Sequence, residues 1–268
     1  MASSTLLKNI NAHVRDRNIK FYEKGHVYYV QRQRGYKSVT TVVHNLFEKF
    51  NADKIIDNMM ASENWPNSKY FGMTKQEIKE SWNKNRDKAA TSGTNMHLLF
   101  ENYYNCIENS EEDTQSVEYQ YFRNFLEDHM LLVPYRTEWN VYHEDVKLAG
   151  SIDMVYINQD GTLSIYDWKR CKSIERFNNF NKKSICEKLS HIPDTNYWHY
   201  ALQLNIYKTI LEEKYGFIVK DLHLVVIHPE NSDNYEKIKL PFLEKAIKII
   251  FDKLKVENNK LSNFFEKK

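Results

Sequence analysis

One strand–turn–strand segment in the middle of the chain constrains the fold more than any other feature. Two runs of strand length, rich in apolar and β-branched side chains, cover residues 149–157 and 162–169. The turn between them, residues 158–161, reads Asn-Gln-Asp-Gly, and Asp-Gly is a strong hairpin signal. The pattern therefore predicts two antiparallel strands, and residues 135–143 supply a third strand beside them.

Segments with helix-type spacing of apolar residues surround these strands. We expect helices over residues 52–60, 74–90, 94–107, 116–130, 194–215 and 241–255. Thr74 and Glu77 fit a capping box, and the helix after Gly93 can continue the one before it. Gly216 is placed to end the helix that precedes it.

The remaining segments add strand patterns. Residues 21–30 resemble one short strand, and residues 221–228 an apolar strand of the buried kind. The β-branched run at 38–43 can either pair back as a hairpin or open a helix, and residues 109–116 and 172–194 are predicted to be irregular.

The order of these elements is helix, three strands, helix, strand, helix. It predicts an α/β fold, in which a mixed central sheet is flanked by helices and preceded by an N-terminal helical elaboration. With 7 glycines and 5 prolines in 268 residues, a long flexible linker is not expected. We therefore expect one domain over 1–268, with the elaboration in 1–92, a core in 93–230 and a terminal helix in 231–268.

Composition narrows the class of protein. The formal charge is only +2, so any nucleic-acid-binding surface must be a local basic patch. The three cysteines, Cys106, Cys171 and Cys186, are too few for a four-thiolate zinc or iron–sulfur site and are expected to be reduced. No run approaches the ~20 apolar residues of a membrane span, and no signal peptide is evident. We expect a soluble, intracellular protein and no membrane partner.

Two acidic residues and a lysine lie within the central strands. Asp167 and Lys169 share one face of their strand because side chains alternate, and Asp153 can reach that face from the partner strand. Two carboxylates of this kind suit Mg²⁺, and the lysine can hold water or stabilise charge on a phosphate. A surface salt bridge is the alternative, but the flanking residues are apolar, and charges in a buried-type run are more often functional.

Two helices carry further polar pairs. His97 and Glu101 lie one helical turn apart, so the imidazole can bind a metal and the carboxylate can bind or orient it. Gln203 and Tyr207 also share a helical face. Each pair alone is weak evidence. A histidine on an apolar helix is more often a satisfied core residue, and a Gln–Tyr pair is common on an ordinary amphipathic helix.

Together these residues resemble the RecB-type branch of the PD-(D/E)XK nuclease superfamily. The matched positions, in the family's order, are Gly93, Thr94, His97, Glu101, Glu138, Gly150, Asp153, Asp167, Lys169, Gln203 and Tyr207. The stretch His26-Val27-Tyr28 and the run at 38–43 are further similar to the subfamily of the mitochondrial genome maintenance exonuclease and to related phage and viral proteins.

The resemblance implies a restriction-endonuclease-like fold and a Mg²⁺- or Mn²⁺-dependent deoxyribonuclease. It implies that His97, Asp153, Asp167 and the Trp168 carbonyl bind metal and that Lys169 is catalytic. Gln203 and Tyr207 would organise the site, and Glu101 and Glu138 would belong to it. Some relatives carry a four-cysteine iron–sulfur cluster, with cysteines after the helix that holds the Gln-x-x-x-Tyr motif. No cysteine follows Cys186 here, so we expect no such cluster.

The expected partner is DNA, single-stranded or with free ends, in replication, repair or recombination. Residues 46–104 are rich in both cations and aromatic residues, a combination suited to single strands, although the aromatic residues can equally form a core. The alternatives are an endoribonuclease with a similar site and a nucleic-acid-binding protein that does not cut. Cleavage polarity, compartment and oligomeric state are not encoded in any recognisable pattern.

Overall fold

The computed structural model describes residues 6–231 and 234–265. Its centre is a six-stranded mixed sheet in the order β3-β5-β6-β7-β8, with β4 paired to β5. The strands are β3 (Lys37–Ser38), β4 (Val133–His143), β5 (Leu148–Ile157), β6 (Leu163–Lys169), β7 (Val219–Val226) and β8 (Glu236–Lys239). Two pairings, β3 with β5 and β6 with β7, are parallel and the others are antiparallel. The predicted mixed sheet is confirmed.

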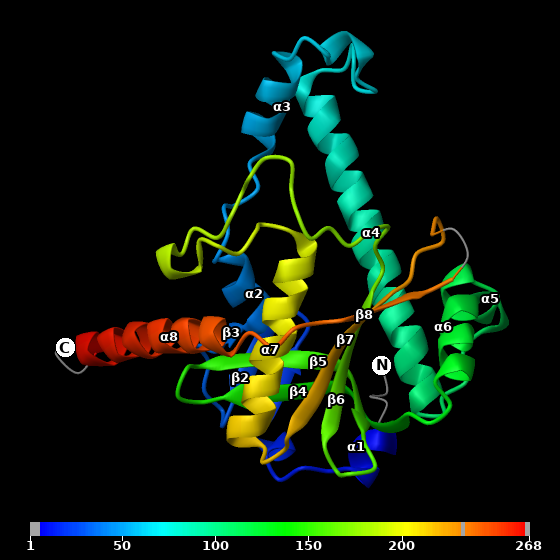
Figure 1. Cartoon of the computed structure of the whole chain (residues 1–268), viewed down its shortest axis with the longest axis vertical. Helices are drawn as coiled ribbons and strands as arrows, with labels where there is room; N and C mark the ends of the chain where they lie inside the picture. Colours follow the sequence, from blue (N-terminus) through cyan, green and yellow to red (C-terminus); the bar gives the residue numbers. More distant parts are fainter. Residues whose placement is uncertain (1–5, 232–233, 266–268) are drawn as a thin grey trace.

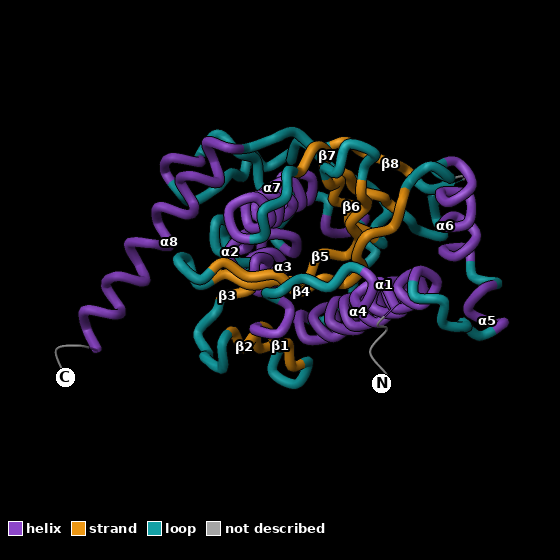
Figure 2. The backbone as a smooth tube through the Cα atoms, turned by 90° about the horizontal axis from the view of Figure 1, so that it is seen from below, coloured by secondary structure: helices purple, strands orange, loops and turns teal. Residues whose placement is uncertain are grey.

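Helices cover both faces of this sheet. They are α1 (Leu6–Ile10), α2 (Val39–His44), α3 (Ala52–Met60), α4 (Lys75–Tyr104), α5 (Glu111–Thr114), α6 (Val117–Asp128), α7 (Asn196–Lys214) and α8 (Glu244–Phe265). Short 3₁₀ turns cover Asp16–Asn18, Trp65–Asn67 and Glu187–Leu189. Figure 2 shows β4 and β5 between α7 on one side and α4 on the other. The α/β class with an N-terminal helical region is therefore confirmed.

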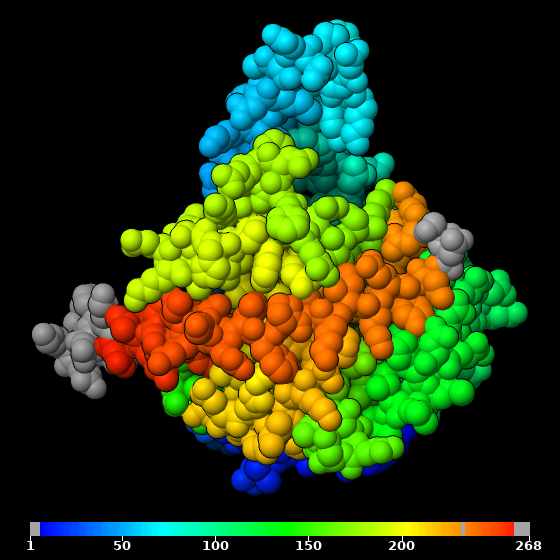
Figure 3. Space-filling model, viewed as in Figure 1, coloured from blue at the N-terminus to red at the C-terminus, as the bar shows by residue number. Residues whose placement is uncertain are grey.

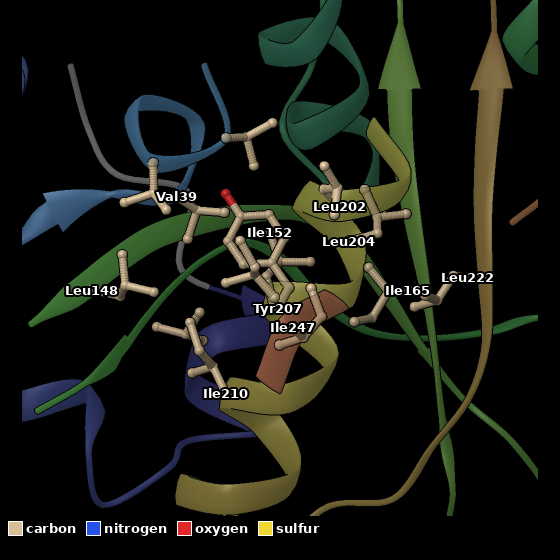
Figure 4. Packing of buried hydrophobic residues seen from close by; sticks show 14 of the residues in the cluster. Val39, Leu148, Ile152, Ile165, Leu202, Leu204, Tyr207, Ile210, Leu222 and Ile247 are labelled. Atoms are coloured by element: carbon tan, nitrogen blue, oxygen red, sulfur yellow. The ribbon is translucent and has the colours of Figure 1, made fainter. Parts of the chain in front are cut away.

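The core consists of two apolar clusters separated by the sheet. The larger joins α2, α7 and α8 to one face, and Figure 4 shows Tyr207 of α7 among its aliphatic side chains. The smaller joins α4 and α6 to the other face, where Phe100 stacks on Phe122 at 4.1 Å and Trp168 meets both rings edge-on. α4 and α7 are thereby held firmly against opposite sides of β5 and β6.

Several local expectations needed correction. Residues 21–30 are not one strand: β1 (Ile19–Tyr22) and β2 (Val27–Val30) form a separate antiparallel hairpin, turned at Gly25 with φ +89°. The run at 38–43 opens α2, whose N-cap is Ser38. β8 was not predicted, because only Ile238 among its residues is buried. The acidic segment expected to be a loop contains the short helix α5.

The helices on either side of Gly93 are one helix. Thr74 and Glu77 form the predicted capping box, and α4 runs unbroken through Gly93 to Tyr104. No helix in the described part of the chain is long and apolar enough to cross a membrane.

A helical projection, residues 50–90, stands away from the sheet and is called the arm below (Figure 1). Its aromatic rings pack on one another: Trp82 donates a hydrogen bond to the Tyr70 hydroxyl at 2.8 Å, and Phe50 lies 5.9 Å from the Trp82 ring. Lys75 and Lys79 both pair with Asp53, at 3.1 and 2.6 Å. Much of the predicted basic and aromatic stretch therefore stabilises the arm itself.

A substitution in β5 tests the packing between sheet and α7. A Cβ on Gly150 would lie 2.7 Å from the Tyr207 ring, whereas a Cβ on Gly93 meets nothing within 4 Å. We expect Gly150→Ala to lower the free energy of unfolding by about 1–3 kcal/mol through overpacking. Gly93→Ala should raise it by up to about 1 kcal/mol through helix propensity. Chemical denaturation measures both; equal stability of Gly150→Ala and wild type would contradict the packing.

Candidate metal centre

The site forms where β5 and β6 separate. The last paired residues are Met154 on β5 and Tyr166 on β6. Their sequence neighbours Asp153 and Asp167 lie just beyond the paired region. Beyond that point the Trp168 amide donates to the Asp153 Oδ2 atom at 3.0 Å instead of to the partner backbone. β6 stays in place because it continues to pair with β7 up to Lys169. At the opening, the Asp153 carboxylate therefore takes the place of a backbone carbonyl as the acceptor for the Trp168 amide.

His97 reaches this opening from α4, which packs on the face of the sheet opposite to α7. Its Nδ1 atom lies 3.3 Å from Glu138 Oε1 and 3.7 Å from Asp153 Oδ2. Its Nε2 atom lies 3.0 Å from the Trp168 carbonyl oxygen. One ligand atom each from His97, Glu138 and Asp153 lies within 4.8 Å of the others, so these three residues could hold a metal ion.

Glu138 reaches the group through an unusual backbone conformation. It lies within β4 at φ +44°, in the left-handed region that a residue other than glycine rarely adopts. Its other carboxylate oxygen, Oε2, accepts a hydrogen bond from Ser151 Oγ at 2.9 Å. Local strain of this kind persists where surrounding structure enforces it, and it clusters at functional sites.

Lys169 and Asp167 form the second half of the site. The ammonium nitrogen lies 2.6 Å from Asp167 Oδ2 and 4.9 Å from the centre of the Tyr200 ring. Gln203 of α7 donates to Asp167 Oδ1 at 3.4 Å. Asp167 is 2% exposed, so its charge is balanced by protein groups more than by bulk water.

Tyr207 and Gly150 set how closely α7 approaches the site. The tyrosine is 3% exposed, and its ring lies against the α-carbon of Gly150, where a side chain would not fit. Burial raises its pKa, as it raises the pKa of Tyr28 on the N-terminal hairpin, so both hydroxyls stay neutral. Tyr207 therefore supports the site as a packed, uncharged group.

Burial and mutual repulsion dominate the electrostatics. Burial raises the pKa of Asp153 and of Asp167, and in Asp167 the neighbouring Asp153 carboxylate raises it further. Burial alone would lower the pKa of His97, but Asp153 and Glu138 outweigh it and raise the pKa to about 9. At neutral pH the ring therefore donates from both nitrogens, to Glu138 and to the Trp168 carbonyl. A metal that binds the ring must displace one of these protons.

The structure brings most of the residues expected from the sequence close to one another. His97, Glu138 and Asp153 form the candidate ligand group, and Asp167 contacts Lys169 and Gln203. Glu101 lies one turn beyond His97 and lines a small polar pocket with Glu138. Sequence patterns gave no signal for Ser151 and Tyr200, because each acts through a neighbour that only the fold supplies.

Comparison with known proteins assigns no family. No protein-family model matches the chain, and no curated protein matches it. Among solved structures, that of SSO0001 is similar over 95% of this chain and 85% of that chain, at 14% identity and a TM-score of 0.36. A likeness this low supports no functional assignment, so the resemblance to PD-(D/E)XK nucleases stays a prediction.

A paired substitution tests the metal site. Asp153→Asn removes a charged ligand, so we expect Mn²⁺ affinity to fall at least about 10-fold in calorimetry. Asp160→Asn is the control, because that residue lies in the exposed turn of the same hairpin and pairs with Lys220. Mn²⁺ affinity of Asp153→Asn equal to that of Asp160→Asn would reject the site.

We also expect Asp153→Asn to change the thermal stability of the metal-free protein in a direction set by the raised pKa of Asp153. A carboxyl whose folded pKa is raised above its unfolded value destabilises the fold as pH rises through the folded pKa. Metal-free Asp153→Asn should therefore melt no lower than wild type at neutral pH. A lower melting temperature would show that the carboxylate serves mainly as a structural hydrogen-bond acceptor.

Proposed function

We propose that the protein is a divalent-metal-dependent nuclease that hydrolyses phosphodiester bonds in DNA. The observation that carries the proposal is the placement of Lys169, paired with Asp167, beside the ligand group of His97, Glu138 and Asp153. A structural ion pair needs one acid and one base. Here three carboxylates, an imidazole and an ammonium converge where two strands separate, which suits a reaction on a phosphate.

The donor set fits Mg²⁺ or Mn²⁺. Carboxylate and main-chain carbonyl oxygens are hard ligands, and one imidazole is compatible with both ions. His97, Asp153 and the Trp168 carbonyl would hold the ion, with Asp167 or Glu138 completing the protein ligands. When bound, the ion supplies a Lewis acid that polarises the phosphate and lowers the pKa of water.

Lys169 supplies the positive charge that the reaction requires. Burial would lower its pKa, but Asp167 and Asp153 outweigh burial and raise it, so the ammonium stays charged at neutral pH. From this position it can orient water toward a phosphate or stabilise charge that grows in the transition state. Gln203 orients Asp167, and Tyr207 fixes the distance between α7 and β5.

DNA replication, repair or recombination is the proposed setting, with a single-stranded or free-ended substrate. The support comes from the sequence resemblance and from the arm, where Phe50 and Phe71 each contact a tryptophan ring on one side and are still 73% and 58% exposed. An RNA-cutting enzyme and a binding protein that does not cut are the competing functions. Parallel DNA and RNA substrates with Mg²⁺ separate all three.

Substitution of the lysine separates chemistry from binding. Lys169→Met should lower turnover by about 10²–10³-fold, because the ammonium acts on charge that develops in the transition state. Its Mn²⁺ affinity should change little. Lys220→Met is the matched control and should retain full turnover, since Lys220 is exposed and paired with Asp160 in the turn between β5 and β6. Wild-type turnover by Lys169→Met would remove it from the mechanism.

The form of the substrate tests dependence on an end. We expect a linear single strand to be degraded with Mg²⁺ and the same strand, closed into a circle, to resist. The measurement is loss of full-length strand on a denaturing gel. Equal degradation of the circle would make the protein an endonuclease.

A further inference from the structure

The segment that joins β6 to α7 holds two large aromatic side chains in open solvent. Phe177 is 81% exposed and Phe180 is 82% exposed. A phenylalanine gains about 1.5–3 kcal/mol on burial, so two rings left in water three residues apart offer an apolar surface that a ligand can cover. The segment around them, residues 172–183, is called the Phe loop below.

The Phe loop is held in shape by side-chain hydrogen bonds. Asn178 donates from Nδ2 to the Lys182 carbonyl at 2.8 Å and accepts at Oδ1 from the Phe180 and Lys182 amides, at 3.1 and 2.9 Å. Asn196 at the start of α7 donates to the Ser173 carbonyl at 2.9 Å. The Trp198 indole donates to the Arg176 carbonyl at 3.2 Å. These bonds fix the turn that presents both rings outward.

The Phe loop itself carries more cations than acids, and two of its cations, Lys172 and Lys182, pair with Glu230 and Glu48 outside it. It contains four cationic residues, Lys172, Arg176, Lys182 and Lys183, against the single acid Glu175. The Arg176 guanidinium stacks on the Tyr197 ring at 4.7 Å, so it is held at the surface beside Phe177. In a chain with a formal charge of only +2, this is a local basic surface with aromatic rings at its tip.

The Phe loop is joined to the site at both ends. It begins three residues after Lys169 and leads into α7, which carries Tyr200 and Gln203. It also meets the base of the arm: Lys182 lies 3.7 Å from Glu48, and Ser184 just beyond the loop donates to the Leu46 carbonyl at 2.9 Å. Figure 3 shows this yellow-green segment projecting beside the cyan arm.

We propose that Phe177 and Phe180 stack on unpaired bases of a single nucleic-acid strand whose backbone reaches the metal centre. The cations of the Phe loop follow the phosphates, and the rings bind base faces without sequence preference. Bases in a duplex are already stacked on each other, so the rings favour single strands over duplexes. The inference rests on the proposed function and assigns part of its substrate preference to these two side chains.

The test is a binding measurement in EDTA, where no cutting occurs. A labelled 20-nucleotide single strand is titrated with wild type and with Phe177→Ala/Phe180→Ala, and anisotropy gives Kd. Stacking predicts that the double variant binds about 5- to 100-fold more weakly. Duplex affinity should stay the same, and Phe177→Trp/Phe180→Trp should restore single-strand binding. Phe242→Ala is the control, an exposed phenylalanine outside the loop.

Abasic strands and salt identify the interaction. Wild type should bind an abasic strand more weakly than an intact strand. The double alanine variant should bind both strands about equally, because removing the base has no further effect once the ring that stacks on it is gone. The salt dependence should keep its slope in the phenylalanine variant and become shallower in Lys182→Ala/Lys183→Ala.

The outcomes separate this inference from the proposed function. If wild type cuts and binds single strands while Phe177→Ala/Phe180→Ala binds equally well, the nuclease stands and the Phe loop has no stacking role. The same holds if single-strand and duplex affinity fall equally, which would indicate lost charge or fold. If wild type neither binds nor cuts any nucleic acid, both proposals fail.

Discussion

Two buried carboxylates, Asp153 and Asp167, repel each other at the centre of the candidate site. Asp153 is 8% exposed and Asp167 2%, and they lie at matching positions just beyond the last paired residues of β5 and β6. Two adjacent carboxylates away from water are costly unless cations and hydrogen bonds compensate. The fold supplies Lys169 and His97 as cations and the Trp168 amide as a donor. A divalent cation would relieve the same repulsion, and His97, Glu138 and Asp153 could hold one.

Strands and helices on several sides position the groups around the carboxylates. Parallel pairing with β7 continues along β6 to Lys169, beyond the point where the pairing with β5 ends. α4 crosses one side to deliver His97, and α7 packs on the other to deliver Gln203 and Tyr207. The absence of a side chain at Gly150 lets the tyrosine ring approach the strand. Glu138, whose backbone lies in the left-handed region, adds a third carboxylate that contacts His97.

Those parts of the molecule with local signals could be predicted from the sequence. The Asp-Gly turn gave the β5–β6 hairpin, the Thr74 capping box gave the start of α4, and Gly216 at φ +75° ends α7 as expected. The β1–β2 hairpin was not predicted, because the short turn at 23–26 lies between two aromatic stretches that together resemble a single strand. The place of Glu138 in the candidate ligand group involves an unusual backbone angle and a histidine 41 residues away, and neither is written in local spacing.

The position of a bound ion is the most direct test of the account. In crystals grown or soaked with Mn²⁺, anomalous scattering locates the metal independently of any activity. We expect a peak where the pairing of β5 and β6 ends, about 2.1 Å from Asp153 and in contact with His97 and the Trp168 carbonyl. Absence of a peak there at saturating Mn²⁺, or a peak only at exposed surface carboxylates, would contradict the central claim that this opening in the sheet is a metal centre.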